Sequence, residues 1–411
     1  MQLNSAGVLP DGCPDTFDSS ARENGLTVII PAYNEEEAIV SIIQRCLDAR
    51  ETIAEAAGLE NVRIIVVDDG SHDRTHELAS KYLPQITLLK HERNKGYGAA
   101  IKYGFKESAT SLVGFLDADG TCDPLLFAKM CRIQKESHCD MVLGSRMGPH
   151  SEMPFVRRVG NWIFSVLLGA LAHKKIQDTA SGMRVLTAES IRKIYPLPDG
   201  LHFTPAMTSR VLFKPGLSLC EVPMPYAERI GKSKLNVLKD GLRFLRVILE
   251  MALIYKPLQF FGAVAAFLFM ICLYYAPGLI AEIVRGESIR DDRIYRMLAL
   301  IAFFVGGLTL LGVGILGQKT AALLHGTAEH VPLSHKRILR WLAPIGAFSI
   351  LLGIAVNIAP LREYVTLGKI LHSWIYIAMG SLLFLAGLQL LAIAILDSIL
   401  DLVVRHQGMK D

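Results

Sequence analysis

The 411-residue sequence predicts an α/β domain with a mostly parallel sheet, followed by a membrane domain of four helices. Between residues 25 and 230, short β-branched runs alternate with helical segments, which is typical of a parallel sheet covered on both faces. From residue 257 onward, apolar stretches long enough to cross a bilayer follow one another. The composition fits this division, because 51% of the residues are hydrophobic and only 20% are charged.

Residues 1–24 are rich in Asp, Ser, Pro and Gly. We expect a mobile tail there rather than a signal peptide, because no basic segment precedes an apolar core. In residues 25–230, apolar runs predict five strands, and three helical segments lie between them. The strands are expected at 27–30, 64–67, 86–89, 112–116 and 141–144, and the helices at 35–49, 74–81 and 98–108.

Residues 231–256 are predicted to form a basic amphipathic helix at the membrane surface. Leucines recur at intervals of three and four residues from Leu235 to Leu249, and Lys239, Arg243 and Arg246 occupy the remaining surface. The alternative is a helix packed into the core of the α/β domain. The position directly before the first apolar stretch favours the membrane surface.

Four membrane-spanning helices are predicted within residues 257–404, and residues 405–411 are expected to form a tail. Each apolar stretch has the length needed to cross a hydrocarbon core of ~30 Å. Charged residues are confined to the gaps between the stretches, which argues against buried helices of a soluble core. The spans are expected at about 258–283, 297–317, 341–359 and 374–396.

The distribution of charge predicts the orientation of these helices. Residues 229–256 carry seven lysines and arginines against two acids, and the loop 318–340 is also basic, whereas acids balance the arginines of 285–296. The positive-inside rule therefore places the α/β domain and both termini in the cytoplasm. No dense basic stripe stands beside aromatics, so nucleic acid is not an expected partner. The seven cysteines are irregularly spaced, which argues against a disulfide framework or a zinc site and favours a reducing compartment.

Four polar motifs stand at strand ends or open a helix: PAYNEE at 31–36, VVDDGS at 66–71, NKGYGAA at 94–100 and DADG at 117–120. Asp117 and Asp119 have the D-x-D spacing that can share one hard cation, Mg²⁺ or Mn²⁺, with phosphate oxygens. Each motif alone is equally typical of a turn or a helix cap. The glycine pattern matches neither a P-loop nor a dinucleotide fingerprint.

Together these motifs resemble the family 2 glycosyltransferases, which have the GT-A fold, a Rossmann-like α/β fold. Downstream residues are similar to those of the polyprenyl-phosphate glycosyltransferases, the group of dolichol-phosphate mannose synthase. The resemblance covers roughly residues 26–250. The downstream matches are Gly144-Ser145-Arg146, QDTASGMR at 177–184, Glu221-Val222-Pro223 and RIGKSK at 229–234.

The resemblance implies a metal-dependent, inverting transfer of one sugar from a UDP- or GDP-sugar to a polyprenyl or dolichyl phosphate at the cytoplasmic membrane face. The implied partners are the nucleotide sugar, the lipid phosphate and the bilayer, and a homo-oligomer is left open. The acceptor phosphate is already anionic at pH 7, so the enzyme mainly has to position it and neutralise charge. Arginine suits that task, because its guanidinium matches phosphate oxygens in a bidentate way.

The resemblance also implies a role for each matching residue. The donor would be bound by Pro31, Tyr33, Glu35, Asp68, Asp117, Arg229 and Lys234. The metal ion (Mg²⁺ or Mn²⁺) would be bound by Asp117 and Asp119. The acceptor phosphate would be bound by Arg146, Arg157 and Asn161. Asp119, Asp178 and Arg146 are the expected catalytic residues. Asp178 is either a base or a residue that orients Arg146 or a sugar hydroxyl.

Two departures from the family pattern leave the sugar open. Asn161 stands where the family has a serine that helps to bind the acceptor phosphate. Thr121 stands where mannose synthases often have a glutamine as a further metal ligand, and a hydroxyl can bind the metal or a water instead.

Two other functions are alternatives. A processive polysaccharide synthase needs a Q-x-x-R-W signature, and the nearest segment, Arg337–Trp341, lacks the glutamine. A non-catalytic scaffold or a transporter of lipid-linked sugars is the second alternative. Both metal carboxylates are present, and no charged path crosses the apolar stretches, so these features favour the enzyme.

Overall fold

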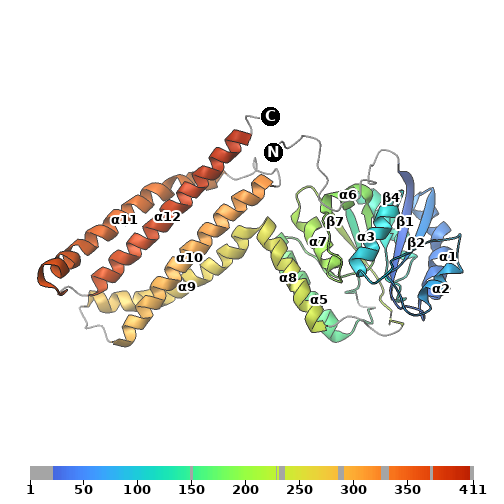
Figure 1. Cartoon of the computed structure of the whole chain (residues 1–411), viewed down its shortest axis with the longest axis horizontal. Helices are drawn as coiled ribbons and strands as arrows, with labels where there is room; N and C mark the ends of the chain where they lie inside the picture. The colour runs from blue at the N-terminus through green and yellow to red at the C-terminus, as the bar shows by residue number, and fades with distance from the viewer. Residues whose placement is uncertain are drawn as a thin grey trace. The chain divides into compact units, whose positions relative to one another are not determined.

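The computed structural model describes residues 22–148, 151–227, 229–230, 237–285, 291–324, 333–370 and 374–407. Two compact units meet in the chain between Met251 and Ala252. The first unit is an α/β domain, and the second consists of long apolar helices (Figure 1). The fold class predicted from the sequence is confirmed as a mostly parallel α/β domain followed by several apolar helices long enough to span a membrane.

The α/β domain is built on a seven-stranded sheet with the order β3-β2-β1-β4-β6-β5-β7. Only β6 runs against its neighbours, β4 and β5, and the other described pairs are parallel. The apolar runs predicted the first five strands. The two remaining strands were not predicted, because charged or polar residues interrupt their apolar pattern. The strands are β1 (Glu23–Ala32), β2 (Asn61–Asp68), β3 (Thr87–Lys90), β4 (Thr110–Phe115), β5 (Met141–Ser145), β6 (Arg184–Thr187) and β7 (Leu219–Pro223).

Helices cover both faces of this sheet. The first helix begins four residues later than the sequence pattern predicts, because the backbone N–H groups of Ala38 and Ile39 close a turn on the carbonyl of Glu35. This turn directs Glu35 towards the carboxyl edge of the sheet. The helices are α1 (Ile39–Ala57), α2 (Thr75–Ser80), α3 (Tyr97–Glu107), α4 (Leu126–Ser137), α5 (Phe155–Ala172), α6 (Ala188–Ile194), α7 (Phe203–Phe213) and α8 (Val237–Tyr255).

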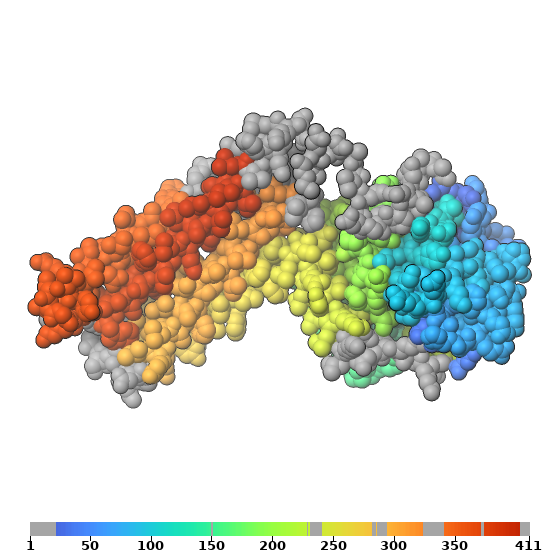
Figure 2. Space-filling view, viewed as in Figure 1, coloured from blue at the N-terminus to red at the C-terminus, as the bar shows by residue number. Residues whose placement is uncertain are grey.

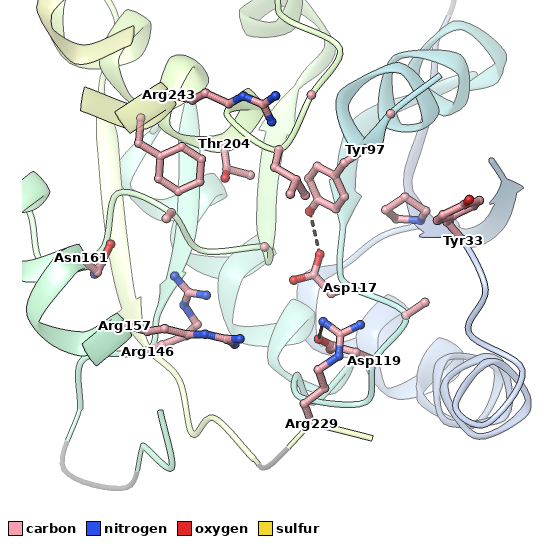
Figure 3. A pocket seen from close by; sticks show the side chains of 18 of the residues that line it. Tyr33, Tyr97, Asp117, Asp119, Arg146, Arg157, Asn161, Thr204, Arg229 and Arg243 are labelled. Atoms are coloured by element: carbon pink, nitrogen blue, oxygen red, sulfur yellow. Dashed lines mark hydrogen bonds and ion pairs between the residues drawn. The ribbon is translucent and has the colours of Figure 1, made fainter. Parts of the chain in front are cut away.

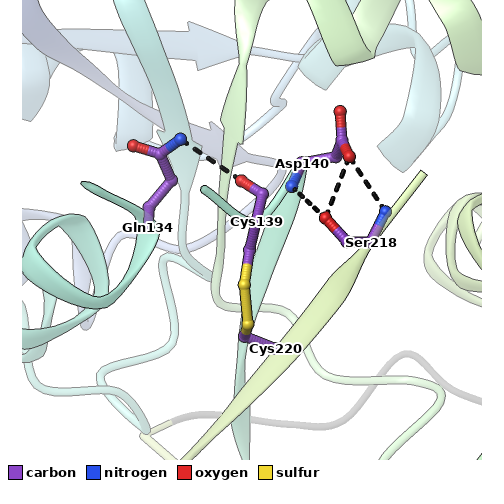
Figure 4. The surroundings of a disulfide bond; sticks show 5 residues. All are labelled: Gln134, Cys139, Asp140, Ser218 and Cys220. Atoms are coloured by element: carbon purple, nitrogen blue, oxygen red, sulfur yellow. Dashed lines mark hydrogen bonds between the residues drawn. A yellow bond between two sulfur atoms is a disulfide. The ribbon is translucent and has the colours of Figure 1, made fainter. Parts of the chain in front are cut away.

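One disulfide joins Cys139 to Cys220, a pair that the irregular cysteine spacing did not indicate (Figure 4). The two residues are 81 positions apart, and the parallel pairing of β5 with β7 brings their Cα atoms to 6.2 Å. Beside them, Ser218 donates its backbone N–H and its hydroxyl to the Asp140 carboxylate. Sequence spacing cannot reveal such a pair, because strand order creates it. The cysteine pattern therefore does not support a reducing compartment.

The second unit contains four long helices, which include the four predicted spans. Helices α10 and α12 lie side by side (Figure 2). The side-chain amide of Gln389 on α12 donates to the hydroxyl of Thr309 on α10, and Lys319 on α10 pairs with Asp397 and Asp401 on α12. These are α9 (Pro257–Val284), α10 (Asp291–Leu324), α11 (Leu333–Leu367) and α12 (Trp374–Gln407).

Candidate active site

One cavity of about 570 Å³ opens at the carboxyl edge of the sheet. The edge collects polar residues because β1, β2, β4 and β5 run in the same direction, so the segments that follow them meet there. Helices α5 and α8 complete the wall. The cavity brings together nine of the residues predicted from the sequence: Pro31, Tyr33, Glu35, Asp117, Asp119, Arg146, Arg157, Asn161 and Arg229.

Three of the predicted site residues are not part of the cavity wall. Lys234 lies outside the described residues. Asp68 is fully buried, and its carboxylate accepts the backbone N–H of Ser71 at 2.9 Å, so it stabilises its own turn. Asp178 is fully buried beside the cavity and does not line it. Asp69 lines the cavity in place of Asp68.

The carboxylates of Asp117 and Asp119 form one side of the cavity (Figure 3). The Tyr97 hydroxyl donates to Asp117 Oδ1 at 2.7 Å, and the Thr121 hydroxyl donates to Asp119 Oδ1 at 2.7 Å. A side chain at Gly182 would overlap the Asp117 carboxylate, so only glycine leaves room for it. Burial and the neighbouring charge of Asp119 raise the pKa of Asp117 to about 6. The Asp119 carboxylate is thus close enough to disfavour the charge on Asp117.

This carboxylate pair fits a hard divalent cation. Its donors are oxygens, which Mg²⁺ and Mn²⁺ prefer, and a cation would relieve the repulsion that raises the pKa of Asp117. Mg²⁺ is commonly held by one or two carboxylates together with substrate phosphates and waters. No cluster of three or more His, Cys, Asp or Glu side chains suited to a metal occurs within the described ranges. The remaining ligands would therefore come from the substrate and from water.

Arg229 links the two sides of the predicted donor site. Its Nη2 lies 2.7 Å from Glu35 Oε1, and its Nη1 lies 3.3 Å from Asp119 Oδ2. Glu35 follows β1 and Asp119 follows β4, so one guanidinium bridges the ends of two neighbouring strands. The positive charge of Arg229 therefore lies where the diphosphate of a bound donor would need to be neutralised.

Arg146 lies across the cavity and is held by a buried ion pair. Its Nε and Nη2 contact the two carboxylate oxygens of Asp178 at 2.7 and 2.8 Å, and its backbone N–H donates to the same carboxylate at 3.0 Å. Burial alone would raise the pKa of Asp178, but the Arg146 charge and these hydrogen bonds lower it below its ordinary value. An aspartate held ionised in this way is a weak proton acceptor, so the geometry favours a role in orienting Arg146.

The loop that carries Asp178 is fixed from two directions. Glu221 on β7 accepts the backbone N–H groups of Gln177 and Asp178 at 3.0 and 3.1 Å. On the other side, the fully buried Arg184 donates from Nε to the carbonyl of Ser181 and from Nη2 to that of Thr179, both at 3.0 Å. The position of Arg146 therefore depends on a rigid, fully hydrogen-bonded support.

Asn161 is part of the same support. Its Nδ2 donates to the Gln177 carbonyl at 3.3 Å, and its Oδ1 accepts the backbone N–H of Thr179 at 3.3 Å. Its amide is thus committed to joining α5 to the loop, although the residue also lines the cavity. The predicted contact with the acceptor phosphate consequently falls more directly on Arg157, one turn earlier on α5.

Several cavity residues were not predicted from the sequence. Tyr97 belongs to a motif that the sequence analysis singled out, but its bond to Asp117 depends on how α3 meets β4. Arg243 and Phe244 lie on α8. The sequence pattern predicts Arg243 at the membrane surface and indicates no role for Phe244. Phe244 packs edge-on against Phe164 of α5, with 6.0 Å between ring centroids.

The cavity therefore has three chemically distinct parts. The carboxylates with Arg229 can hold a cation and a diphosphate, and Arg146 with Arg157 can hold a second phosphate. The remainder of the wall is largely apolar. Helix α5 contributes Val156, Gly160 and Phe164, helix α8 contributes Gly241 and Phe244, and other segments contribute Ala32, Ala100, Met153 and Leu201. Such a wall suits the hydrocarbon part of an amphiphilic molecule.

Comparisons with known proteins found relatives of this chain. The chain is 29% identical over 245 residues to a dolichyl-phosphate hexose transferase from Haloferax volcanii, covering 58% of this chain and 96% of that one. It is 25% identical over 312 residues to a dodecaprenyl-phosphate galacturonate synthase from Rhizobium johnstonii, covering 72% and 87%. A low-salt glycan biosynthesis hexosyltransferase from Haloferax volcanii is 29% identical over 54% of this chain, and the chain spans only 53% of that relative's length.

A solved structure of glucosyl-3-phosphoglycerate synthase from Mycobacterium tuberculosis aligns with 56% of the chain and 78% of its own, at 18% identity and a TM-score of 0.43. The family described as "Glycosyl transferase family 2" matches residues 27–195. The resemblance of the motifs is thereby confirmed, and the chain belongs to the family 2 glycosyltransferases.

Proposed function

We propose that this glycosyltransferase moves one sugar from a nucleotide-sugar donor to a polyprenyl or dolichyl phosphate. The observation that carries the proposal is the cavity itself, which combines a carboxylate pair, arginines and an apolar wall. A soluble acceptor would not need the apolar part. Relatives named as dolichyl-phosphate and dodecaprenyl-phosphate sugar transferases support the same acceptor class.

In this proposal the donor lies along the edge formed by β1 and β4. Tyr33 and Glu35 would contact the nucleoside portion, and Arg229 would neutralise the diphosphate. Asp117 and Asp119 would hold Mg²⁺ or Mn²⁺, and Thr121 would keep the Asp119 carboxylate oriented through its hydroxyl. A bound cation would supply charge neutralisation at the leaving diphosphate.

The acceptor phosphate would lie between Arg146 and Arg157, with its lipid along the wall of α5 and α8. Because that phosphate is an anion at neutral pH, it can attack the anomeric carbon without a protein base. A single displacement from the face opposite the leaving group inverts that carbon. Asp178 would act only through Arg146, by holding the guanidinium at a fixed angle.

We further propose the arrangement at the membrane. The sugar-transfer domain would comprise residues 25–230, residues 231–256 would lie at the membrane surface and residues 257–404 would form the spanning domain. The basic residues of 229–256 and 318–340 support a cytoplasmic location for the catalytic domain and both termini.

A donor panel tests the proposal. Purified protein is incubated with Mn²⁺ or Mg²⁺, a polyprenyl phosphate and labelled UDP- and GDP-sugars, and lipid products are identified by mass spectrometry. We expect one sugar per lipid from at least one donor. Transfer of none, or growth of a polymer on the lipid, would reject the proposal.

Two variants test the site. Asp119→Asn is expected to abolish transfer while the protein remains folded. Asp123→Asn is the matched control, because Asp123 lies on the same loop, is about half exposed and does not line the cavity. Retained activity in Asp119→Asn would contradict the assignment of the metal and donor site.

A further inference from the structure

His91 is a buried polar side chain that the proposed mechanism does not use. It follows directly after β3 and is 7% exposed. Its backbone N–H donates to the Asp68 carbonyl at 2.9 Å. Its ring stacks on that of Tyr103 of α3, with 13° between the planes and 5.1 Å between the centroids. Both the backbone and the ring are therefore fixed, so the ring nitrogen Nδ1 points in a defined direction.

Nδ1 of His91 lies 2.7 Å from Asp69 Oδ1. A carboxylate only accepts hydrogen bonds, so the imidazole donates its Nδ1 proton. Asp69 is 3% exposed, follows β2 and lines the cavity. Its backbone N–H donates at 2.8 Å to the carbonyl of Ala32, the residue before Tyr33. The imidazole thus holds a carboxylate of the cavity wall on the side where the proposed donor lies.

Asp69 in turn shapes the loop that leads into α3. Its Oδ1 accepts the backbone N–H of Lys95 at 3.0 Å, and its Oδ2 accepts that of Gly96 at 2.8 Å. A Cβ atom at Gly70 would lie 2.6 Å from the backbone carbonyl carbon of Arg93, so the turn after β2 and this loop touch backbone to backbone. The conformation of the loop therefore depends on the direction of one carboxylate.

The loop also reaches the proposed metal site. Two of its residues line the cavity, and the next residue, Tyr97, begins α3 and donates its hydroxyl to Asp117 Oδ1 (Figure 3). A connected series of contacts therefore runs from His91 through Asp69 and the loop at 94–97 to a carboxylate predicted to bind the metal. The arginines predicted to bind the acceptor phosphate come from other segments, the end of β5 and α5.

We propose that His91 is a positioning residue for the donor and its metal ion. By donating to Asp69, it holds the carboxylate in the direction that fixes the loop at 94–97 and, through Tyr97, the Asp117 carboxylate. Its effect on the donor rests on the proposed function. A site that is held in place in advance binds its ligand more tightly, because less conformational freedom is lost on binding. A residue that only stabilises the fold would leave that affinity unchanged.

Nucleotide binding to the full chain tests this role. UDP and GDP are each titrated calorimetrically, with Mn²⁺ present, into protein in detergent. In His91→Leu, which removes the donor to Asp69, the Kd of the nucleotide that wild type binds should rise about tenfold. In His91→Asn it should stay within about threefold of wild type, because the amide Nδ2 can stand where Nδ1 stands and donate the same bond. His91→Gln, whose amide nitrogen lies at the Nε2 position instead, replaces His91→Leu if that variant does not fold.

Thr27→Val is the matched control. Thr27 on β1 is fully buried, its hydroxyl bonds that of Thr110 at 2.7 Å, and it does not line the cavity. The variant therefore loses a buried hydrogen bond of the same sheet without touching the series of contacts from His91. Its thermal midpoint without ligand should fall, and its nucleotide Kd should equal that of wild type.

The possible contrary results separate the inference from the proposed function. A lower midpoint with an unchanged Kd in His91→Leu, as in the control, would show a role in the fold alone and overturn the inference. A raised Kd that His91→Asn does not restore would overturn it as well, because the Nδ1 bond would not be the cause. Failure of wild type to bind either nucleotide would instead reject the proposed donor site, and the inference with it.

Discussion

Asp178→Asn separates the two roles that the sequence leaves open for this residue, base or orienting partner. The substitution keeps the size of the side chain and removes its charge. In the structure the carboxylate accepts both guanidinium contacts of Arg146, at 2.7 and 2.8 Å, and the backbone N–H groups of Arg146 and Ala180. An asparagine can accept only through its single oxygen, so one charge-assisted contact is lost and the Arg146 charge is left poorly compensated.

The expected loss of stability is about 3 kcal/mol, because breaking a buried ion pair from one side costs roughly 3–5 kcal/mol and asparagine keeps part of the hydrogen bonding. For a domain of this size that lowers the unfolding midpoint by roughly 6–12 °C, measured by scanning fluorimetry in detergent. The pKa of Asp178 is lowered in the folded state, so its stabilisation is complete above the unfolded pKa of about 4. The difference in unfolding free energy between wild type and variant should therefore vanish as the pH falls through the pKa that Asp178 has in the folded protein.

The kinetic result distinguishes the roles. If Asp178 orients Arg146, the apparent KM for the lipid phosphate rises about tenfold, equivalent to about 1.4 kcal/mol, and kcat changes little. Arg146→Lys should show the same pattern, because lysine keeps the charge and loses the bidentate geometry. A base would instead lower kcat by about 10²–10⁴ with little change in KM. That outcome in Asp178→Asn would refute the orienting role.

Three further predictions follow from contacts at the site and in the second unit. Thr121→Val removes the hydroxyl that donates to Asp119. Because the lost hydrogen bond is worth ~1 kcal/mol, the Mn²⁺ concentration for half-maximal transfer should rise about fivefold. An unchanged concentration would show that Thr121 does not orient the carboxylate. Because the pKa of Asp117 is raised to about 6, protons should compete with the metal below that pH. The Mn²⁺ concentration for half-maximal transfer should therefore be about fourfold higher at about pH 5.5 than at about pH 7.5. No change across this range would contradict the competition. Lys319→Met leaves Asp397 and Asp401 without their cationic partner and should lower the thermal midpoint in detergent. Adding Asp397→Leu should restore part of that midpoint. If the single variant is as stable as wild type, the ion pair does not stabilise the packing of α10 against α12.

The sequence predicted the elements whose pattern is local. The β-branched runs gave the first five strands, and the polar motifs at strand ends indicated that Asp117 and Asp119 lie in a pocket, whereas Arg146 was expected there from the family resemblance. Strands β6 and β7 could not be predicted in this way, because each interrupts its apolar residues with charged or polar ones, Arg184 and Thr187 in β6 and Glu221 in β7. Such strands form only once the rest of the domain exists.

Side-chain partners were harder to predict than positions. Asn161 stands in the expected place on α5, yet its amide is bonded to the loop at 177–179, a contact that depends on the path of a loop without regular structure. Glu221 and Arg184 belong to motifs that are visible in the sequence. Their hydrogen bonds to the loop at 177–181 depend on the pairing of β7 and β6 with β5. Long-range hydrogen bonds of this kind leave no periodic signal in a sequence.

The disulfide between Cys139 and Cys220 constrains the register of β7 against β5 at the edge of the sheet. Strand β7 is an edge strand, held on one side only, by β5. A slip of one residue would turn each of its side chains to the other face, and Glu221 would then release the backbone N–H groups of Gln177 and Asp178. A covalent link next to Glu221 forbids that slip. The angle at which Arg146 is presented to the cavity is thus secured by a bond that touches neither substrate site.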